Sequence, residues 1–135
     1  MSLRGLRSVC DLRSLREREA LLALWLARAL EADRRAAVPS PANAPGAGTL
    51  TAAELSAAML VAELGQAHRS RCLDLVAEAE TASETARVKW AEAASAHRAL
   101  ERLLARRYRE ERSRRTKKAQ AGLDEAALVM WGRQR

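Results

Sequence analysis

The sequence contains no phenylalanine, and its aromatic residues are three tryptophans and one tyrosine among 135 residues. β-Branched residues are also scarce, although a β-sandwich or an α/β core of this size draws heavily on β-branched and aromatic side chains. Alanine, leucine, arginine and glutamate dominate instead, and these residues lose little side-chain freedom on a helix. The composition therefore predicts an all-α protein of long helices that bury narrow apolar stripes.

Cysteine and long apolar runs are also in short supply. Cys10 and Cys72 are too few to staple a small secreted domain, so we expect reduced cytosolic thiols. The most apolar run, Ala20 to Leu30, is about half the roughly 20 residues of a membrane span, and Arg28 interrupts it. Acidic residues near the N-terminus argue against a targeting peptide. We therefore expect neither a transmembrane segment nor a leader sequence.

All three prolines fall in one stretch, VPSPANAPGAGTL, from Val38 to Leu50. Proline removes a helical hydrogen bond and clashes with the preceding turn, and glycine raises the entropic cost of helix formation. The sequence therefore predicts one coiled-coil domain over 1–135, a long antiparallel two-helix hairpin. Its expected parts are a first helix at about 2–37, a Pro/Gly loop at 38–50, a second helix at about 51–121 and a short helical tail at 123–131.

The start of the second helix has a clear signal. Thr51 followed by Glu54 fits a capping box, in which each side chain accepts a hydrogen bond from a backbone N–H near the other. Leu50 and Leu55 stand at the two positions of a hydrophobic staple. Gly122, by contrast, is predicted to end this helix before the tail.

Each helix shows an apolar stripe at helical spacing. The expected hairpin core is Leu15, Leu22, Leu26, Leu64, Leu75 and Trp90. On the second helix the stripe is spaced at about 3.6 residues, which predicts little supercoiling. Leu21, Leu24 and Trp25 add apolar surface on other faces of the first helix, and a helix that is apolar on several sides normally touches several neighbours. This surface is either a thicker core or a docking site for another protein.

Charge is concentrated in RALERLLARRYREERSRRTKK, residues 98 to 118, here called the basic segment. It holds ten basic and three acidic residues, a balance of 10 − 3 = +7 that equals the formal charge of the chain. Glu110 with Arg114 and Glu111 with Arg115 form expected i, i+4 pairs, which moderate the repulsion only slightly. Because the second helix is predicted to be about twice as long as the first, we expect the basic segment to be its unpaired half. A field of one sign at one end suggests an acidic partner.

Motifs for catalysis and metal binding are lacking. There is no Gly-rich phosphate loop and no nucleophile beside a base, so we expect no enzymatic activity and no cofactor. His68 and Cys72 lie one helical turn apart, which can present two metal ligands, but no full ligand set is evident. We interpret both as stripe residues.

Nucleic-acid binding is the main rival from another class. A leucine-zipper basic region precedes its zipper and uses asparagine among its base readers. Here the basic residues follow the stripe, and the only asparagine is Asn43 in the loop. Clustered arginines would still bind phosphates at low salt. A membrane-peripheral basic helix is a third alternative.

The order of three segments resembles the FliJ family of flagellar export proteins and its relatives in virulence-type secretion. These segments are LRGLRSVCDLRSLREREA near the N-terminus, VKWAEAASAHRALERLLARR around Trp90, and AQAGLDEAALVMW near the C-terminus. The resemblance implies an antiparallel coiled-coil stalk in the cytoplasm, peripheral to the inner-membrane export apparatus. It also implies a hexameric export ATPase, an export gate membrane protein and export chaperones as partners. A homodimer in isolation is a further possibility.

The resemblance also implies which residues make these contacts. The export-gate interaction would use Val61, His68 and Cys72. The first helix and the loop are shorter than is usual in the family, and Gly65 interrupts the second helix near this end. The ATPase interaction would use Leu6, Val9, Leu12, Arg106, Arg107, Tyr108, Arg109, Leu123, Asp124 and Glu125.

Overall fold

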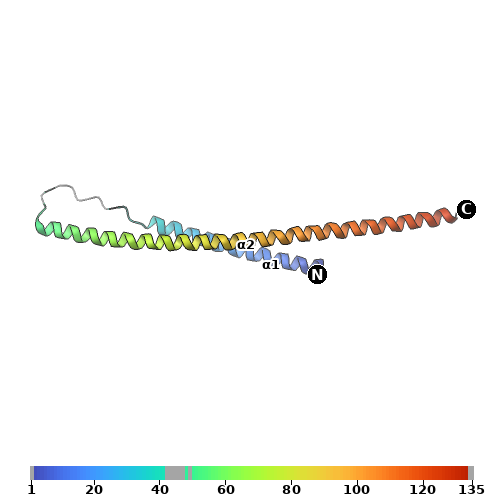
Figure 1. Ribbon diagram of the computed structural model, residues 1–135, viewed down its shortest axis with the longest axis horizontal. Helices are drawn as coiled ribbons and strands as arrows, with labels where there is room; N and C mark the ends of the chain where they lie inside the picture. The colour runs from blue at the N-terminus through green and yellow to red at the C-terminus, as the bar shows by residue number, and fades with distance from the viewer. Residues whose placement is uncertain (1, 42–47, 49, 134–135) are drawn as a thin grey trace. The chain divides into compact units, whose positions relative to one another are not determined.

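The chain folds into two helices, α1 (Leu3–Ala36) and α2 (Ala52–Arg133). The computed structural model describes residues 2–41, 48 and 50–133. The two helices pack against each other as a hairpin (Figure 1), and the described residues contain no strand. The prediction of an all-α helical hairpin is therefore confirmed.

The boundaries of α1 match the prediction closely, but those of α2 differ at its C-terminal end. α2 runs without a break through Gly122 to Arg133, so the separate tail at 123–131 was wrong. Gly122 has no positive φ, and one glycine costs a helix about 1 kcal/mol relative to alanine without ending it. Of the predicted loop, residues 42–47 and 49 lie outside the described residues.

Both helices begin at a polar cap. The Ser2 hydroxyl oxygen accepts a hydrogen bond from the Gly5 N–H at 3.1 Å. At the start of α2 the Thr51 N–H donates to Glu54 Oε2 at 2.7 Å, and the Glu54 N–H donates to Thr51 Oγ1 at 3.3 Å. The predicted capping box is therefore present. The donated backbone hydrogen bond lowers the pKa of Glu54, with a smaller contribution from the Thr51 hydroxyl.

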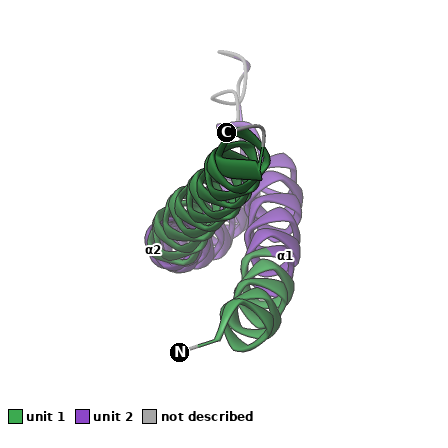
Figure 2. Ribbon diagram, turned by 90° about the vertical axis from the view of Figure 1, so that its right-hand side faces the viewer, with its two compact units in different colours: residues 1–17, 92–135 green, residues 18–91 purple. Residues whose placement is uncertain are grey.

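The chain divides into two compact units, shown in Figure 2. Unit 1 comprises residues 1–17 and 92–135, and unit 2 comprises residues 18–91. Each unit contains a piece of α1 and a piece of α2.

In unit 1 the pieces of α1 and α2 meet along a seam with alternating spacings of three and four residues, the heptad pattern of coiled coils. Leu6, Cys10 and Ala94 are buried there. The buried and half-buried positions that follow the pattern are Leu3, Leu6, Cys10, Arg13 and Glu17 on α1, and Ala93, His97, Leu100 and Leu104 on α2.

In unit 2 the seam has the same spacing but smaller side chains. Leu24 is the largest buried residue on α1 in this unit, and on α2 Val76, Ala79 and Ser83 are buried. Arg35 Nη2 lies 2.8 Å from Glu80 Oε1 and 2.7 Å from Glu31 Oε1, and the first of these ion pairs links the two helices.

The predicted hairpin core was mostly wrong. Only Trp90 is half-buried. The other five predicted core residues are exposed: Leu15 (54%), Leu22 (63%), Leu26 (72%), Leu64 (64%) and Leu75 (37%). The sequence offers two heptad-spaced faces on α1, and the prediction took the one with more leucines. The structure buries the other face instead, where Glu17 meets a matching polar group on α2.

The expected position of the basic segment was also wrong. In unit 1, Glu17 contacts His97, and Leu3 lines a groove with Tyr108, Arg112 and Arg115. Much of the basic segment therefore lies beside α1 and is not the unpaired half of α2. In unit 2, Arg35 near the end of α1 pairs with Glu80 of α2. Residues 52–68 of α2 lie beyond this contact and are almost all exposed. The 15 residues between Ala36 and Ala52 (52 − 36 − 1) can reach about 50 Å, so the linker does not force a tight turn.

Candidate partner-binding surfaces

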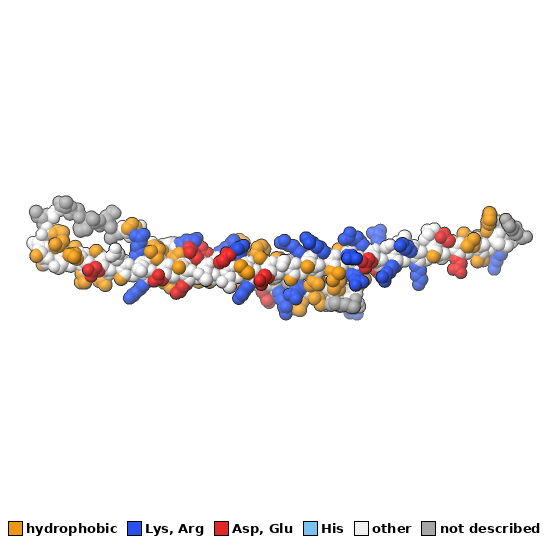
Figure 3. Space-filling view, in the orientation of Figure 1, with side chains coloured by type: hydrophobic (Ala, Val, Ile, Leu, Met, Phe, Trp, Pro, Cys, Tyr) orange, Lys and Arg blue, Asp and Glu red, His pale blue; other side chains and the backbone are white. Residues whose placement is uncertain are grey.

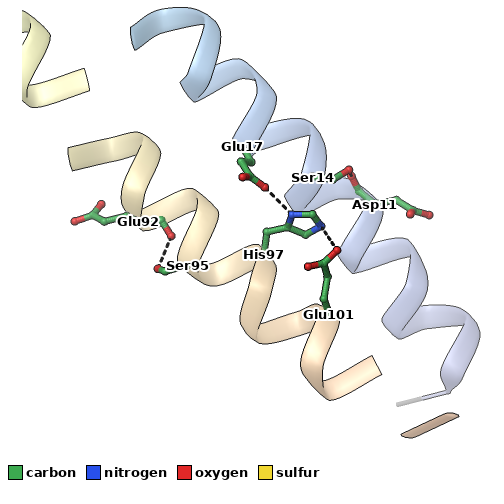
Figure 4. Close-up of polar contacts among 7 residues, drawn as sticks. All are labelled: Asp11, Ser14, Glu17, Glu92, Ser95, His97 and Glu101. Carbon is green, nitrogen blue, oxygen red and sulfur yellow. Dashed lines mark hydrogen bonds and ion pairs between the residues drawn. The ribbon is translucent and has the colours of Figure 1, made fainter. Parts of the chain in front are cut away.

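A polar cluster interrupts the apolar seam of unit 1. His97 Nδ1 lies 2.6 Å from Glu17 Oε2 across the two helices, and His97 Nε2 lies 3.7 Å from Glu101 Oε1 on α2. Figure 4 shows the imidazole between the two carboxylates. The His97 and Glu17 side chains are only 17% and 26% exposed. The contact fixes one register of α1 against α2, because sliding by one turn would leave both groups partly buried without partners.

Both cysteines are free thiols. Cys10 is a free thiol in the seam of unit 1, and burial raises its pKa, with further contributions from Glu101 and Asp11. Cys72 Sγ lies 3.8 Å from His68 Nε2 in unit 2. Among the described residues, no group of three or more His, Cys, Asp and Glu could hold a metal ion.

The basic segment has fewer ion pairs than cations. Arg106 Nε lies 2.9 Å from Glu110 Oε1, and Arg107 Nη1 lies 3.7 Å from Glu110 Oε2. Arg115 Nε lies 3.1 Å from Glu111 Oε1, so this predicted pair is confirmed. The predicted pair of Glu110 with Arg114 is not formed, because Glu110 pairs with Arg106 and Arg107, which precede it in the chain. In Figure 3 the Lys and Arg side chains crowd this part of α2.

Past Arg115, α2 continues with no cover from α1. We call residues 116–133 the α2 end; it shares residues 116–118 with the basic segment, and every one of its residues is exposed. Lys117 and Lys118 open it, and Asp124 accepts a hydrogen bond from Gln120 at 3.0 Å. The large apolar side chains of the α2 end, each between 55% and 72% exposed, are Leu123, Leu128, Val129, Met130 and Trp131.

The residues expected to bind an ATPase all belong to unit 1, but they do not form one exposed surface. Leu6 is buried in the seam and Val9 is half-buried, so Leu6 is unavailable to a partner. Leu12 and Tyr108 are about half exposed. The remaining residues are exposed on α2: Arg106, Arg107, Arg109, Leu123, Asp124 and Glu125.

The residues expected to contact an export gate belong to unit 2. Val61 and His68 are exposed, and Cys72 is half-buried at the beginning of the seam. His68 and Arg69 line a pocket of about 580 Å³ together with Pro39 and Pro41. Residues 39–41, which follow α1, therefore lie beside this part of α2.

Two surfaces in unit 2 were not predicted in detail from the sequence. Leu22, Trp25 and Leu26 form an exposed apolar face of α1. Of the residues for which a thicker core and a docking site were left as alternatives, Leu24 is buried, Leu21 is half-buried and Trp25 is exposed. An open groove of about 470 Å³ also lies between the two helices. Its small lining residues give no motif, so only the packed structure reveals it.

None of the described helices has a stretch long and apolar enough to cross a membrane. The fold defines a class, the two-helix all-α hairpin with coiled-coil spacing. Comparison of the chain with models of known protein families, with curated proteins and with solved structures finds no match.

Proposed function

We propose that this protein is a non-enzymatic stalk or adaptor of a type III protein export apparatus, flagellar or virulence-type. It binds the hexameric export ATPase through unit 1 and the export gate through the α2 residues near His68. The support is the sequence resemblance together with the helical hairpin. Under this proposal the protein works in the cytoplasm at the membrane-bound apparatus and also assists export chaperones.

The observation that carries the proposal is the α2 end with the basic segment before it. Eighteen consecutive helical residues, 116–133, are exposed although they include five large apolar side chains. Exposed apolar surface of this kind marks an interaction site. The arginines of the basic segment outnumber their carboxylate partners, which favours an acidic partner.

The proposed mechanism needs no chemistry from this chain. A ring ATPase passes through several conformations, and a stalk that binds one of them more tightly shifts the population toward it. The apolar residues of the α2 end would supply binding free energy, and the arginines would speed association with an acidic surface. The seam of unit 1 holds α1 against α2 through the Glu17–His97 contact, directly before the basic segment.

The test measures binding of the purified chain to the export ATPase and the rate of ATP hydrolysis. Replacing Arg106, Arg107 and Arg109 by glutamate should weaken binding at least about tenfold, since like charges would then face each other. The matched control replaces Arg28, Arg34 and Arg71, which are exposed residues of unit 2, and changes the net charge equally. We expect this control to bind the ATPase nearly as the parent does.

Circular dichroism should show the same helix content for both variants. Equal loss of affinity in the two would reduce the effect to net charge and contradict a specific surface. No binding and no change in hydrolysis with the parent chain would reject the proposal itself.

The uncompensated cations also favour a second candidate function, binding of nucleic-acid phosphates. Arg112, Arg114, Lys117 and Lys118 take part in none of the ion pairs of the described residues. Such contacts release counterions and weaken steeply with salt. Binding to duplex DNA that persists at about 150 mM salt with a sequence preference would favour this candidate over the stalk.

A further inference from the structure

The groove of unit 2 is the surface of interest. Ala20 and Ala23 line it on the α1 side, and the α2 side is lined by Glu78, Thr81, Ala82, Thr85, Ala86 and Lys89. Small side chains on both walls let another helix approach the groove closely. The groove is open, and it belongs to neither the basic segment nor the α2 end.

The two threonines make the groove more apolar than its composition indicates. The Thr81 hydroxyl donates to the Ala77 carbonyl at 2.9 Å, and the Thr85 hydroxyl donates to the Thr81 carbonyl at 2.9 Å. Both hydroxyl donors are therefore satisfied within α2. A helix covering the groove meets threonine methyl groups and alanines, and leaves neither hydroxyl proton without an acceptor.

Opposite charges stand at the two ends of the groove. Glu78 and Lys89 are both exposed, and neither takes part in the ion pairs of the described residues. The spacing of Glu78, Ala82, Thr85 and Lys89 is four, three and four residues, which places all four on one face of α2. In the sequence, Glu78 and Lys89 are equally far from the bond between Ser83 and Glu84, and so are Ala82 and Thr85.

We propose that this groove is the interface with a second copy of the chain, with α2 packed antiparallel on α2 about a two-fold axis between Ser83 and Glu84. The symmetry places Glu78 opposite the other copy's Lys89, and Ala82 opposite its Thr85. Each contact then occurs twice, as in any isologous interface. A parallel arrangement would instead place Glu78 against Glu78, which is unfavourable.

Apolar surface on α1 extends the interface. Leu30 lies two turns after Ala23 on the same side of α1, and it is 48% exposed, while Leu26 is 72% exposed. Two hairpin faces of this length would bury about 1,200 Å² in total, the lower end for specific interfaces. We therefore expect a dimer with a dissociation constant on the order of micromolar.

This inference is independent of the proposed export function, because its surface is confined to unit 2 and the proposed ATPase contacts are in unit 1. Loss of ATPase binding would leave the dimer untouched, and a monomeric chain would leave the stalk proposal standing.

The experiment is sedimentation equilibrium of the full chain from about 1 to 300 µM, spanning the expected dissociation constant. Glu78→Lys and Lys89→Glu should each raise the dissociation constant about tenfold, because each replaces two attractive contacts by repulsive ones. The double variant Glu78→Lys/Lys89→Glu restores opposite charges in the antiparallel dimer. It should return to within about threefold of the parent chain.

A second pair of variants tests the groove by shape. Ala82→Arg places a long charged side chain in the groove and should abolish dimerisation. Ala77→Arg is the matched control, because Ala77 is exposed on α2 and does not line the groove. The parent chain remaining monomeric throughout would overturn the proposal. A double charge variant as weak as the single ones, or equal effects of the two arginines, would overturn it as well.

Discussion

Two stretches of α2 within unit 1 have similar residues and opposite surroundings. Residues 94–104 lie beside α1, where Ala94 is buried and His97, Leu100 and Leu104 are half-buried. The α2 end is exposed throughout, although Leu123, Leu128 and Met130 are as apolar as anything in the seam. Composition therefore does not distinguish a packed stretch of this helix from an unpacked one.

The difference is the presence of α1, which covers one stretch and stops before the other. Helical propensity and hydrogen bonds within the helix can hold the α2 end as a helix, but its apolar side chains gain nothing from burial. In the packed stretch, burial contributes and a change in volume has a cost.

The largest expected effect is the loss of a packed leucine from unit 1. Leu6→Ala should lower the free energy of unfolding by about 2–4 kcal/mol, since Leu6 is only 6% exposed. Leu128→Ala, at 72% exposure, should change it by less than about 0.5 kcal/mol. Urea unfolding followed by circular dichroism at 222 nm measures both. Similar losses for the two would mean that the α2 end packs against something.

Overpacking the seam should have the next largest effect. Ala94 is 3% exposed, so Ala94→Leu should force α1 and α2 apart locally and cost about 1–3 kcal/mol. Ala121→Leu is the control, because Ala121 is exposed and leucine is nearly as good a helix former as alanine. The same unfolding assay applies. A neutral Ala94→Leu would contradict the close approach of the helices in unit 1.

The capped start of α2 should respond locally. Thr51→Ala should destabilise the first turn by about 1 kcal/mol, because the Glu54 N–H loses its acceptor. The pKa of Glu54 is lowered in the folded chain, so its stabilising contact is present above the ordinary glutamate pKa. This contribution is lost as the pH falls through the lowered value. In acid, the amides of residues 53–56 should therefore exchange faster than their intrinsic exchange rates at that pH predict. The Glu54→Gln variant should not show this additional dependence on pH.

The smallest expected effect concerns the polar contact of the seam. A double-mutant cycle with Glu17→Gln and His97→Phe should give a coupling free energy of about 0.5–1 kcal/mol, since both side chains are only partly buried. Unfolding in urea measures the four proteins of the cycle. A coupling of zero would remove the contact as a determinant of register.

The sequence predicted the elements better than their pairing. Proline and glycine between Val38 and Leu50 marked the break, and Thr51 with Glu54 marked the start of α2 correctly. The prediction of which face of α1 is buried was wrong, because α1 has two heptad-spaced faces and counting leucines favours the face of Leu22 and Leu26 over that of Leu24. Only the partner helix decides between them. The register could not be predicted for a related reason, since a long linker permits many offsets and the Glu17–His97 contact joins residues 80 apart.

Some of the candidate surfaces could be predicted from the sequence and others could not. The basic segment was evident from charge alone, but its division into a part beside α1 and an exposed part depends on the register. The groove around Ala82 has no signal in sequence, because alanine and threonine are unremarkable on any helix. Its charges at Glu78 and Lys89 gain meaning only when the groove between them is known.

Hydrogen exchange of the chain with and without the export ATPase tests the central claim most directly, namely that the α2 end is a partner surface. The account predicts strong new protection between Arg106 and Trp131, and little change in residues 94–104, which α1 already covers. Unchanged exchange over the α2 end in a saturated mixture would contradict it.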